Sequence, residues 1–345
     1  MLGTQRRSVR GPIEERRPPA VGTAPTPRTR RTRRWGWLSA AVVLVAVAVG
    51  ALVVTAASGE SQAAPLHALS RPVHMTVSHH TLMIDGHERR WREEVPDGVE
   101  GPFPLVIVLH GAGLDGDRMA AGSDFSQHAA RMGFALAFPD GLYTGWDAGG
   151  CCTPADVDHM ADPEFLDAML ADLEGREVTT AGNVYAVGFS NGGMMALSAA
   201  CAADSPIRAV AVVAAALVSD CPRSSPVSVL MMHGTDDGMV PVAGYEGVVP
   251  ATGKPLVYPP LGETLAQFAQ KGRCSSVPVR QRYADAIVDL RFDKCANGYE
   301  VHALLFEGAA HNWPNGKRPV GPNGFLRFDA GTEVLHFFGL LPDAA

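Results

Sequence analysis

Short apolar runs alternate with segments of helical pattern along most of the chain, and this alternation constrains the fold more than any other feature. Each run is rich in Val, Leu, Ile or Phe and is closed by Gly, His or Pro, as expected for a strand buried on both faces. The predicted strands are 104–109, 134–138, 184–189, 209–214, 227–232 and 301–306. The predicted helices are 123–132, 163–173, 191–203, 263–271 and 331–338. This order predicts an α/β fold in which a mostly parallel central sheet has helices on both faces.

Two further segments, 75–80 and 88–95, alternate apolar and polar residues instead of forming continuous apolar runs. Such alternation is typical of a strand with one exposed face, so we expect an antiparallel hairpin at one edge of the sheet. Residues 71–345 contain no internal repeat and no Ser/Thr/Pro-rich linker to a second module. Their length suits one large α/β domain, and we therefore expect a single catalytic domain over 71–345.

The net charge of −7 is divided unevenly between the N-terminal segment and the rest of the chain. Residues 1–34 contain ten Arg and two Glu and carry +8, whereas the other 311 residues carry −15. An acidic main body excludes nucleic-acid binding as the principal function. The Arg- and Pro-rich head cannot bury a hydrophobic core, so we expect residues 1–34 to be a disordered cytoplasmic segment.

The segment 35–57 contains no charged residue and is long enough to cross a bilayer. The Arg cluster directly before it predicts that the head stays in the cytoplasm and that everything after a linker at 58–70 is exported. A secretory signal is the open alternative, because small residues at 55–57 and 61–63 offer cleavage sites. We therefore expect a catalytic domain that is either anchored at the cell surface through 35–57 or secreted after cleavage.

All six cysteines follow the apolar segment, which is consistent with an oxidising compartment. A short loop and hairpin separate the last two, so a Cys274–Cys295 disulfide is favoured, with Cys201–Cys221 next. The adjacent pair at 151 and 152 is left either to bond to itself or to cross-pair with the second set. Neither a C-x-x-C nor an H-E-x-x-H motif occurs, so we expect no metal site and no cofactor.

The pentapeptide G-F-S-N-G at 188–192 joins the strand at 184–189 to the helix at 191–203. This is the G-x-S-x-G nucleophile elbow in its strand, turn and helix context. Its glycines are needed because the sharp turn strains the serine backbone and brings neighbouring backbone too close for a Cβ. We predict that Ser190 is a catalytic nucleophile rather than the N-cap of a structural helix.

A serine nucleophile needs a base oriented by an acid, and in this fold the acid precedes the histidine in the chain. The loop after the strand at 227–232 contains two candidate carboxylates, and its H-G-x-x-D-x-x-V-P pattern favours Asp237 over Asp236. His311 follows the last strand on a loop of small residues that can approach the serine. Two other late histidines lie inside regular elements and are expected to be structural: His302 and His336.

The oxyanion hole of such an enzyme needs two backbone N–H groups, one from the residue after the nucleophile and one from the loop after the third strand. Asn191 supplies the first. For the second we predict Ala112, with Gly111 as the alternative. His110 precedes them and is expected to have a conformational role under the loop rather than to act as a base.

Several stretches match one known family. They are P-L-V-I-V-L-H-G-A-G at 104–113, F-P-D-G at 138–141, G-W-D-A-G-G-C-C at 145–152, F-L-D-A-M-L at 165–170, V-Y-A-V-G-F-S-N-G-G-M-M at 184–195, H-G-T-D-D-G-M-V-P at 233–241 and A-H-N-W-P at 310–314. With these stretches the chain resembles the polyhydroxybutyrate depolymerase and feruloyl esterase group of secreted α/β-hydrolases. The resemblance implies a carboxylic-ester hydrolase with a triad of Ser190, Asp237 and His311. It also implies that Trp146 and Trp313 help to wall the acyl pocket, unless they are core residues.

Asp147 departs from this family, which usually has Asn at that position, and it would place a negative charge near the pocket mouth. No substrate-adsorbing module is evident, so we expect small esters or oligomeric polyesters of hydroxyalkanoate, feruloyl or acetyl type as substrates. Three alternatives to a serine esterase remain open at this point. They are a cell-envelope acyltransferase with the same triad, a serine peptidase and a binding module without catalysis.

Overall fold

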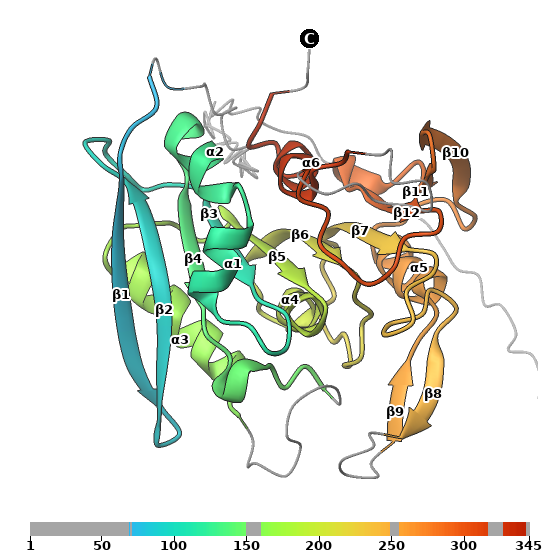
Figure 1. The fold of residues 1–345 in the computed structure, drawn as a ribbon, viewed down its shortest axis with the longest axis horizontal. Helices are drawn as coiled ribbons and strands as arrows, with labels where there is room; N and C mark the ends of the chain where they lie inside the picture. Colours follow the sequence, from blue (N-terminus) through green and yellow to red (C-terminus); the bar gives the residue numbers. More distant parts are fainter. Residues whose placement is uncertain (1–68, 70, 150–159, 249–254, 317–326, 343–345) are drawn as a thin grey trace, which may run out of the picture. The chain divides into compact units, whose positions relative to one another are not determined.

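The predicted strands assemble into one large sheet in the computed structural model, which describes residues 69, 71–149, 160–248, 255–316 and 327–342. Among these residues the sheet runs in the order β1 (Met75–Ile84), β2 (His87–Pro96), β4 (Ala135–Pro139), β3 (Leu105–Leu109), β5 (Val184–Phe189), β6 (Ile207–Val213), β7 (Ser228–Gly234), β12 (Val301–Phe306), β11 (Ile287–Phe292) and β10 (Val279–Ala284). The central strands from β4 to β12 pair in parallel. Antiparallel pairs complete both edges of the sheet (Figure 1).

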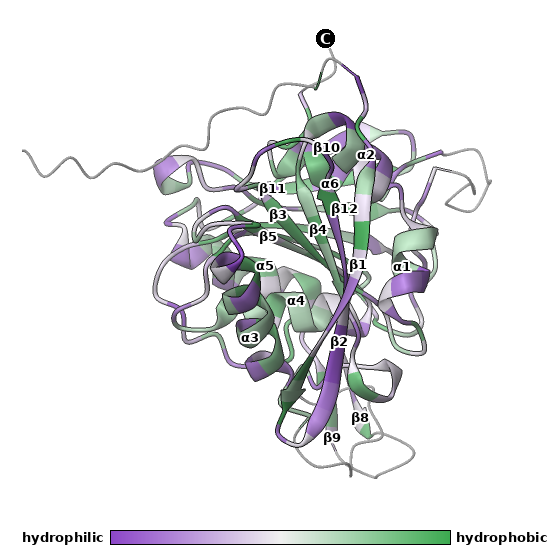
Figure 2. Cartoon of the chain, turned by 90° about the vertical axis from the view of Figure 1, so that its left-hand side faces the viewer, coloured by the Kyte–Doolittle hydropathy of each residue, from purple (hydrophilic) through white to green (hydrophobic). Residues whose placement is uncertain are grey.

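Helices cover both faces of the sheet, and the alternation of side chains along β3 shows why. Leu105, Ile107 and Leu109 pack in one core with α3 (Asp162–Gly175), α4 (Asn191–Cys201) and α5 (Leu261–Lys271). Val106 and Val108 pack in a second core with α1 (Gly116–Gly122), α2 (Phe125–Met132) and α6 (Ala330–Phe337). Figure 2 shows the apolar strands between helices whose outer surfaces carry hydrophilic residues. The predicted α/β class and the two helical layers are confirmed.

The predicted elements agree closely with the observed ones, and the differences have local causes. The six apolar runs and the edge hairpin β1–β2 all form strands. The hairpin expected between Cys274 and Cys295 is the edge pair β10–β11. The bounds of its strands were not predicted, because β10 is almost entirely exposed and β11 carries charged residues, so neither is a continuous apolar run. The helix α1 was also not predicted, since it is short and begins and ends with glycine. The small separate sheet of β8 (Tyr245–Val248) and β9 (Pro255–Tyr258) was not predicted, because each strand has only four residues.

Two of the predicted disulfides are present: Cys201–Cys221 and Cys274–Cys295. The first joins the end of α4 to the loop before β7, and the second joins the segment after α5 to that after β11. Cys151 and Cys152 lie outside the described residues, so their pairing stays a prediction.

The N-terminal predictions concern residues that the structure does not describe. The head at 1–34, the apolar segment at 35–57 and, apart from Leu69, the linker at 58–70 are all outside the described ranges. Within the described ranges, no helix combines the length and the apolar character needed to cross a membrane.

Candidate active site

Ser190 occupies the turn between β5 and α4 in a backbone conformation that only a constrained site maintains. Its φ of 53° and ψ of −124° lie outside the regions that non-glycine residues favour. Its N–H donates to the Val213 carbonyl at 2.9 Å, which ties the turn to β6. A Cβ at Gly188 would collide with the Gly192 backbone, and one at Gly192 with the His110 carbonyl. Both glycines of the pentapeptide are therefore required by close backbone approach, as predicted.

The structure brings Ser190, His311 and Asp237 together from the carboxyl ends of three parallel strands, β5, β12 and β7. His311 Nε2 lies 2.9 Å from Ser190 Oγ, and His311 Nδ1 lies 2.8 Å from Asp237 Oδ2. Both distances are those of hydrogen bonds. With a proton on Nδ1, the imidazole can accept the serine hydroxyl proton at Nε2 while the carboxylate stabilises the resulting positive charge.

The carboxylate of Asp237 is buried, and both of its oxygens accept hydrogen bonds. Oδ1 accepts hydrogen bonds from the N–H groups of Met239 and Val240, each at 2.8 Å. Oδ2 faces His311 and also His233, whose Nε2 is 3.3 Å away. Burial alone would raise the pKa of Asp237, but the hydrogen bonds from the two histidines and the two amides hold this pKa well below its ordinary value. Asp237 is thus ionised at neutral pH.

His233 was not identified from the sequence as part of the site. It is buried, and its Nε2 also lies 2.6 Å from the Val240 carbonyl, so this nitrogen faces two acceptors and carries the proton. The signal was present in the sequence, because His233 is the first residue of the H-G-x-x-D-x-x-V-P pattern. Only the structure shows that the chain turns after β7 and brings the Asp237 carboxylate back to His233.

The residues that the sequence analysis did not favour as catalytic lie away from the Ser190 hydroxyl or form other hydrogen bonds. Asp236 is exposed and accepts a hydrogen bond from the neighbouring Thr235 hydroxyl at 3.2 Å. His302 lies within β12, with Nδ1 3.1 Å from the buried Asp289 carboxylate on β11. His336 lies in α6. Of the two adjacent carboxylates, only Asp237 contacts His311 in the described structure.

The two predicted oxyanion donors come from the loop after β3 and from the first residue of α4. Ala112 is exposed, and no described residue accepts a hydrogen bond from its N–H. The next residue, Gly113, donates to the Thr144 carbonyl at 2.7 Å and so fixes the loop. Asn191 begins α4, the end of a helix at which amide groups and the helix dipole favour negative charge.

The side chain of Asn191 is buried and exchanges two hydrogen bonds with the backbone of Trp146. Trp146 N–H donates to Asn191 Oδ1 at 2.7 Å, and Asn191 Nδ2 donates to the Trp146 carbonyl at 2.9 Å. The Trp146 indole N–H donates to the His110 carbonyl at 2.9 Å. Trp146 is 0% exposed, so the expectation that it walls an open pocket is not met. It lies in the core, hydrogen-bonded to the loop after β3 and to the first residue of α4.

His110 supports the loop after β3 and does not face Ser190. Its Nδ1 donates to the Gly111 carbonyl at 2.9 Å, and its Nε2 accepts the Gly141 N–H at 2.9 Å. Burial lowers the pKa of His110, which keeps the ring neutral and matches this use of one nitrogen as donor and the other as acceptor. The structure thus gives His110 the conformational place expected from the sequence.

Two aromatic side chains lie near His311. The ring of Phe189 lies 5.2 Å from the imidazole, and Trp313 meets Phe189 edge-on at 6.3 Å between ring centroids. Both rings are partly exposed, so they can contact a bound molecule. A Cβ at Gly111 would lie 2.8 Å from the Phe189 ring, which places this ring directly against the loop after β3. Phe189 was not singled out from the sequence.

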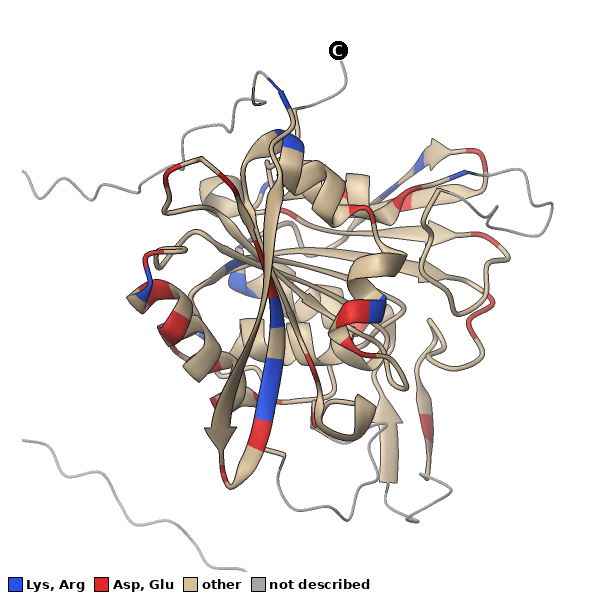
Figure 3. Cartoon of the chain, turned by 60° about the vertical axis from the view of Figure 1, so that its left-hand side comes forward, with Lys and Arg blue, Asp and Glu red and all other residues tan. Residues whose placement is uncertain are grey.

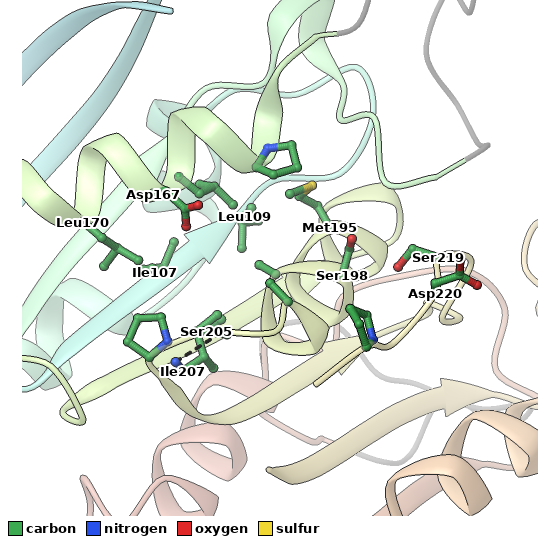
Figure 4. A pocket seen from close by; sticks show the side chains of 17 residues that line it. Ile107, Leu109, Asp167, Leu170, Met195, Ser198, Ser205, Ile207, Ser219 and Asp220 are labelled. Atoms are coloured by element: carbon green, nitrogen blue, oxygen red, sulfur yellow. Dashed lines mark hydrogen bonds between the residues drawn. The ribbon is translucent and has the colours of Figure 1, made fainter. Parts of the chain in front are cut away.

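A separate apolar cavity of about 320 Å³ lies against α3 and α4 (Figure 4). Its aliphatic walls come from Ile107, Leu109, Leu166, Leu170, Met195 and Ile207. Ser190, Asp237 and His311 do not line it, so it is distinct from the candidate active site. Within the ranges that the structure describes, no cluster of three or more His, Cys, Asp or Glu side chains could hold a metal ion.

Comparisons with known proteins identify the family of this chain. A family model described as Phospholipase/Carboxylesterase matches residues 163–251, the segment that contains Ser190 and Asp237. Putative esterase NocK of Nocardia uniformis subsp. tsuyamanensis is 30% identical over 318 residues, which cover 84% of this chain and 92% of that protein. Feruloyl esterase C of Emericella nidulans is 25% identical over 285 residues, which cover 79% of this chain and 93% of that protein.

Among solved structures, an acetyl xylan esterase from Aspergillus awamori has a TM-score of 0.56 at 14% identity. The match covers 76% of this chain and 100% of that one, and it shows a shared fold. The similarity to NocK extends over most of both chains. The chain therefore belongs to the family of α/β-hydrolase esterases that includes Putative esterase NocK, and it is a feruloyl esterase-like carboxylic-ester hydrolase.

Proposed function

We propose that this protein is an extracytoplasmic serine esterase in which Ser190, His311 and Asp237 form the catalytic triad. The observation that carries the proposal is the continuous hydrogen-bonded chain from Ser190 Oγ through His311 to Asp237, with distances of 2.9 and 2.8 Å. It begins at a serine held in a strained turn and ends at a buried carboxylate with a lowered pKa. Such a chain suits nucleophilic acyl transfer.

In the acylation step, His311 Nε2 takes the proton from Ser190 Oγ as this oxygen bonds to the ester carbonyl carbon. The carbonyl oxygen becomes an oxyanion, which the N–H groups of Ala112 and Asn191 stabilise. When the tetrahedral intermediate collapses, the bond to the alcohol oxygen breaks and His311 donates its proton to that oxygen. The acyl group remains on Ser190 and the alcohol leaves.

In the deacylation step, a water molecule takes the place of the alcohol. His311 removes a proton from the water as its oxygen bonds to the acyl carbon, and the same two amides hold the second oxyanion. Collapse breaks the bond to Ser190 Oγ, which regains its proton from His311, and the free acid leaves. Asp237 keeps His311 in the tautomer with a proton on Nδ1 and stabilises its cationic form in both steps.

Relatives and site aromatics together suggest the substrate class. The similar proteins are named as feruloyl and acetyl xylan esterases, so we propose feruloyl or acetyl esters of carbohydrates as substrates. The partly exposed rings of Phe189 and Trp313 beside His311 offer apolar surface to a planar acyl group. Because the named relatives are esterases, we propose hydrolysis rather than acyl transfer to another alcohol.

The proposed location outside the cytoplasm rests on chemistry of the described domain and on the N-terminal sequence. Two disulfides in the domain suit an oxidising compartment. The uncharged segment at 35–57, preceded by ten Arg, supports export with either retention at the membrane or cleavage.

A fluorophosphonate probe and an ester panel test the proposal together. The probe should label the wild-type protein at Ser190, and Ser190→Ala should lose both the label and the hydrolysis of methyl ferulate and p-nitrophenyl acetate. Ser198→Ala, on the same helix but facing the separate apolar cavity, is the matched control and should retain both. Wild-type rates in Ser190→Ala would show that the assignment is wrong.

A further inference from the structure

The loop at 140–147 contacts both sides of the proposed oxyanion hole. On one side, the Trp146 backbone exchanges two hydrogen bonds with the Asn191 side chain. On the other side, Gly113 N–H donates to the Thr144 carbonyl at 2.7 Å, and the Trp146 indole N–H donates to the His110 carbonyl at 2.9 Å. Asn191 and the residues on either side of Ala112 are thus attached to one segment of chain.

This loop holds an unfavourable backbone conformation. Tyr143 and Thr144 are consecutive non-glycine residues with φ values of 52° and 62°, in the left-handed region. At Gly141 a Cβ would collide with the Gly145 carbonyl, so the loop turns very tightly. Such strain of about 1 to 3 kcal/mol per residue persists only where the surroundings fix the conformation. The contacts that fix this loop must therefore be strong.

Both of its ends are held by carboxylates, one partly exposed and one completely buried. At the end, Asp147 N–H donates to Asp162 Oδ2 at 2.7 Å. At the start, the Asp140 carboxylate accepts the Gly116 N–H at 2.7 Å and pairs with Arg90 Nε at 2.7 Å. Arg90 is exposed on β2, a strand along which Figure 3 shows basic and acidic residues next to one another.

The Asp162 carboxylate is completely buried and is paired with Arg89, which is also completely buried. Arg89 lies on the inner face of β2, donates to the Met160 carbonyl at 2.8 Å and stacks over the ring of Phe165 at 4.2 Å. One carboxylate oxygen therefore neutralises the guanidinium, and the other is left to accept the Asp147 amide. Two charges removed from water are costly unless paired in this way.

We propose that the 140–147 loop, locked by Asp162 and Arg89, positions both amides of the oxyanion hole. This inference rests on the proposed function and assigns positioning roles to Asp162, Arg89 and Trp146, none of which touches the reacting atoms in the mechanism. Donors that are already in place stabilise a developing oxyanion without reorganisation, and a displacement of about 1 Å can cost about 10²-fold in rate. Loosening the loop should therefore lower kcat more than it raises KM.

A pair of double variants separates this role from simple stabilisation. Arg89→Met with Asp162→Asn removes both charges and keeps an oxygen that can accept the Asp147 N–H. Arg89→Met with Asp162→Leu removes both charges and that oxygen as well. An apolar replacement of a buried ion pair is often neutral or stabilising, so stability alone gives no reason for the Leu variant to be less active.

The expected result is a kcat about 10- to 100-fold lower in the Leu variant than in the Asn variant, with similar KM. The Ki of phenylboronic acid, whose boron bonds to Ser190 Oγ while a boron-bound oxygen enters the oxyanion hole, should rise by the same factor as kcat/KM falls. Titration of active sites with a fluorophosphonate corrects for any unfolded fraction. Equal kcat and Ki in the two double variants would overturn the inference.

Two further variants keep the test decisive. If the Leu variant does not fold, Trp146→Phe replaces the indole with a smaller aromatic ring and removes the N–H bound to His110, and an unchanged Ki in it would overturn the inference. Asp289→Leu is the matched control, because Asp289 is a buried, ion-paired carboxylate on β11, which is separated from β5 by three strands. It should lower stability without raising Ki. Failure of the proposed function would instead appear as hydrolysis retained by Ser190→Ala.

Discussion

His233 Nε2 lies 3.3 Å from Asp237 Oδ2, the same oxygen that contacts His311 Nδ1 at 2.8 Å. One carboxylate oxygen therefore faces two imidazoles, one exposed to the site and one buried. The second imidazole and the amides of Met239 and Val240 fix the carboxylate in orientation and favour its charged form. This arrangement explains why Asp237, rather than its exposed neighbour Asp236, is suited to orient the base.

Replacing Asp237 by Asn should lower kcat by about 10⁴-fold while leaving KM similar, because the amide would favour the wrong tautomer of His311. Steady-state hydrolysis of p-nitrophenyl acetate measures the effect. Asp236→Asn is the matched control and should stay near wild type, since Asp236 is exposed and does not contact His311. A large loss in Asp236→Asn with normal rates in Asp237→Asn would reverse the assignment.

The lowered pKa of Asp237 should also appear in the pH dependence of stability. A carboxyl whose pKa is lower in the folded than in the unfolded state stabilises the fold above its ordinary pKa of 3.8, and this contribution is lost as the pH falls further. The difference in free energy of unfolding between wild type and Asp237→Asn should therefore shrink below pH 3.8. Urea denaturation of both proteins from pH 6 downward, at about half-unit steps, measures it. A difference that stays constant through this range would contradict the shift.

His110 should make the fold sensitive to mild acid. Its pKa is lowered by burial from an ordinary value of 6.5, so the unfolded chain takes up the proton first, and stability falls as the pH drops below 6.5. His110→Gln keeps one donor and one acceptor but cannot be protonated. The stability advantage of wild type over His110→Gln should therefore decline below pH 6.5, by at most about 1.4 kcal/mol per pH unit. Parallel slopes for the two proteins would show that His110 does not titrate in this way.

Tyr143 should contribute to acyl selectivity. Its side chain is 53% exposed, and its loop is bonded to the loop of Ala112 through Gly113 and Thr144. Tyr143→Ala should lower kcat/KM for methyl ferulate by about 2- to 12-fold, because one aromatic contact contributes about that factor to binding. The substitution should have little effect on p-nitrophenyl acetate. Tyr143→Phe should retain the feruloyl preference.

The matched control for Tyr143 is Tyr283→Ala, since Tyr283 is similarly exposed at 47% but lies on the edge strand β10. Equal losses for feruloyl and acetyl esters in Tyr143→Ala would indicate a disturbed loop rather than a contact with the acyl group.

Much of the fold followed from local patterns. Strands such as β3, with five buried residues in succession, can be recognised in the sequence, because every position must be apolar when both faces of the strand are covered. The edge strands β10 and β11 lack this pattern, because the exposed β10 carries charged residues such as Arg280 and β11 contains the buried, ion-paired Asp289. Hence the strand bounds at the centre of the sheet were predictable, whereas this edge was predictable only as a hairpin between Cys274 and Cys295.

The sequence by itself determined the fold class and indicated the three residues of the proposed triad, Ser190, Asp237 and His311. Each follows a strand in a short pattern that local sterics impose, and parallel strands bring their carboxyl ends to one edge. Only the tertiary structure decided how these groups are supported. Arg89 and Asp162 are 73 residues apart, and Trp146 and Asn191 are 45 apart, so their pairing depends on strand order and helix packing. No periodicity marks such pairs, because a buried hydrogen bond requires only that two groups meet, whatever their separation along the chain.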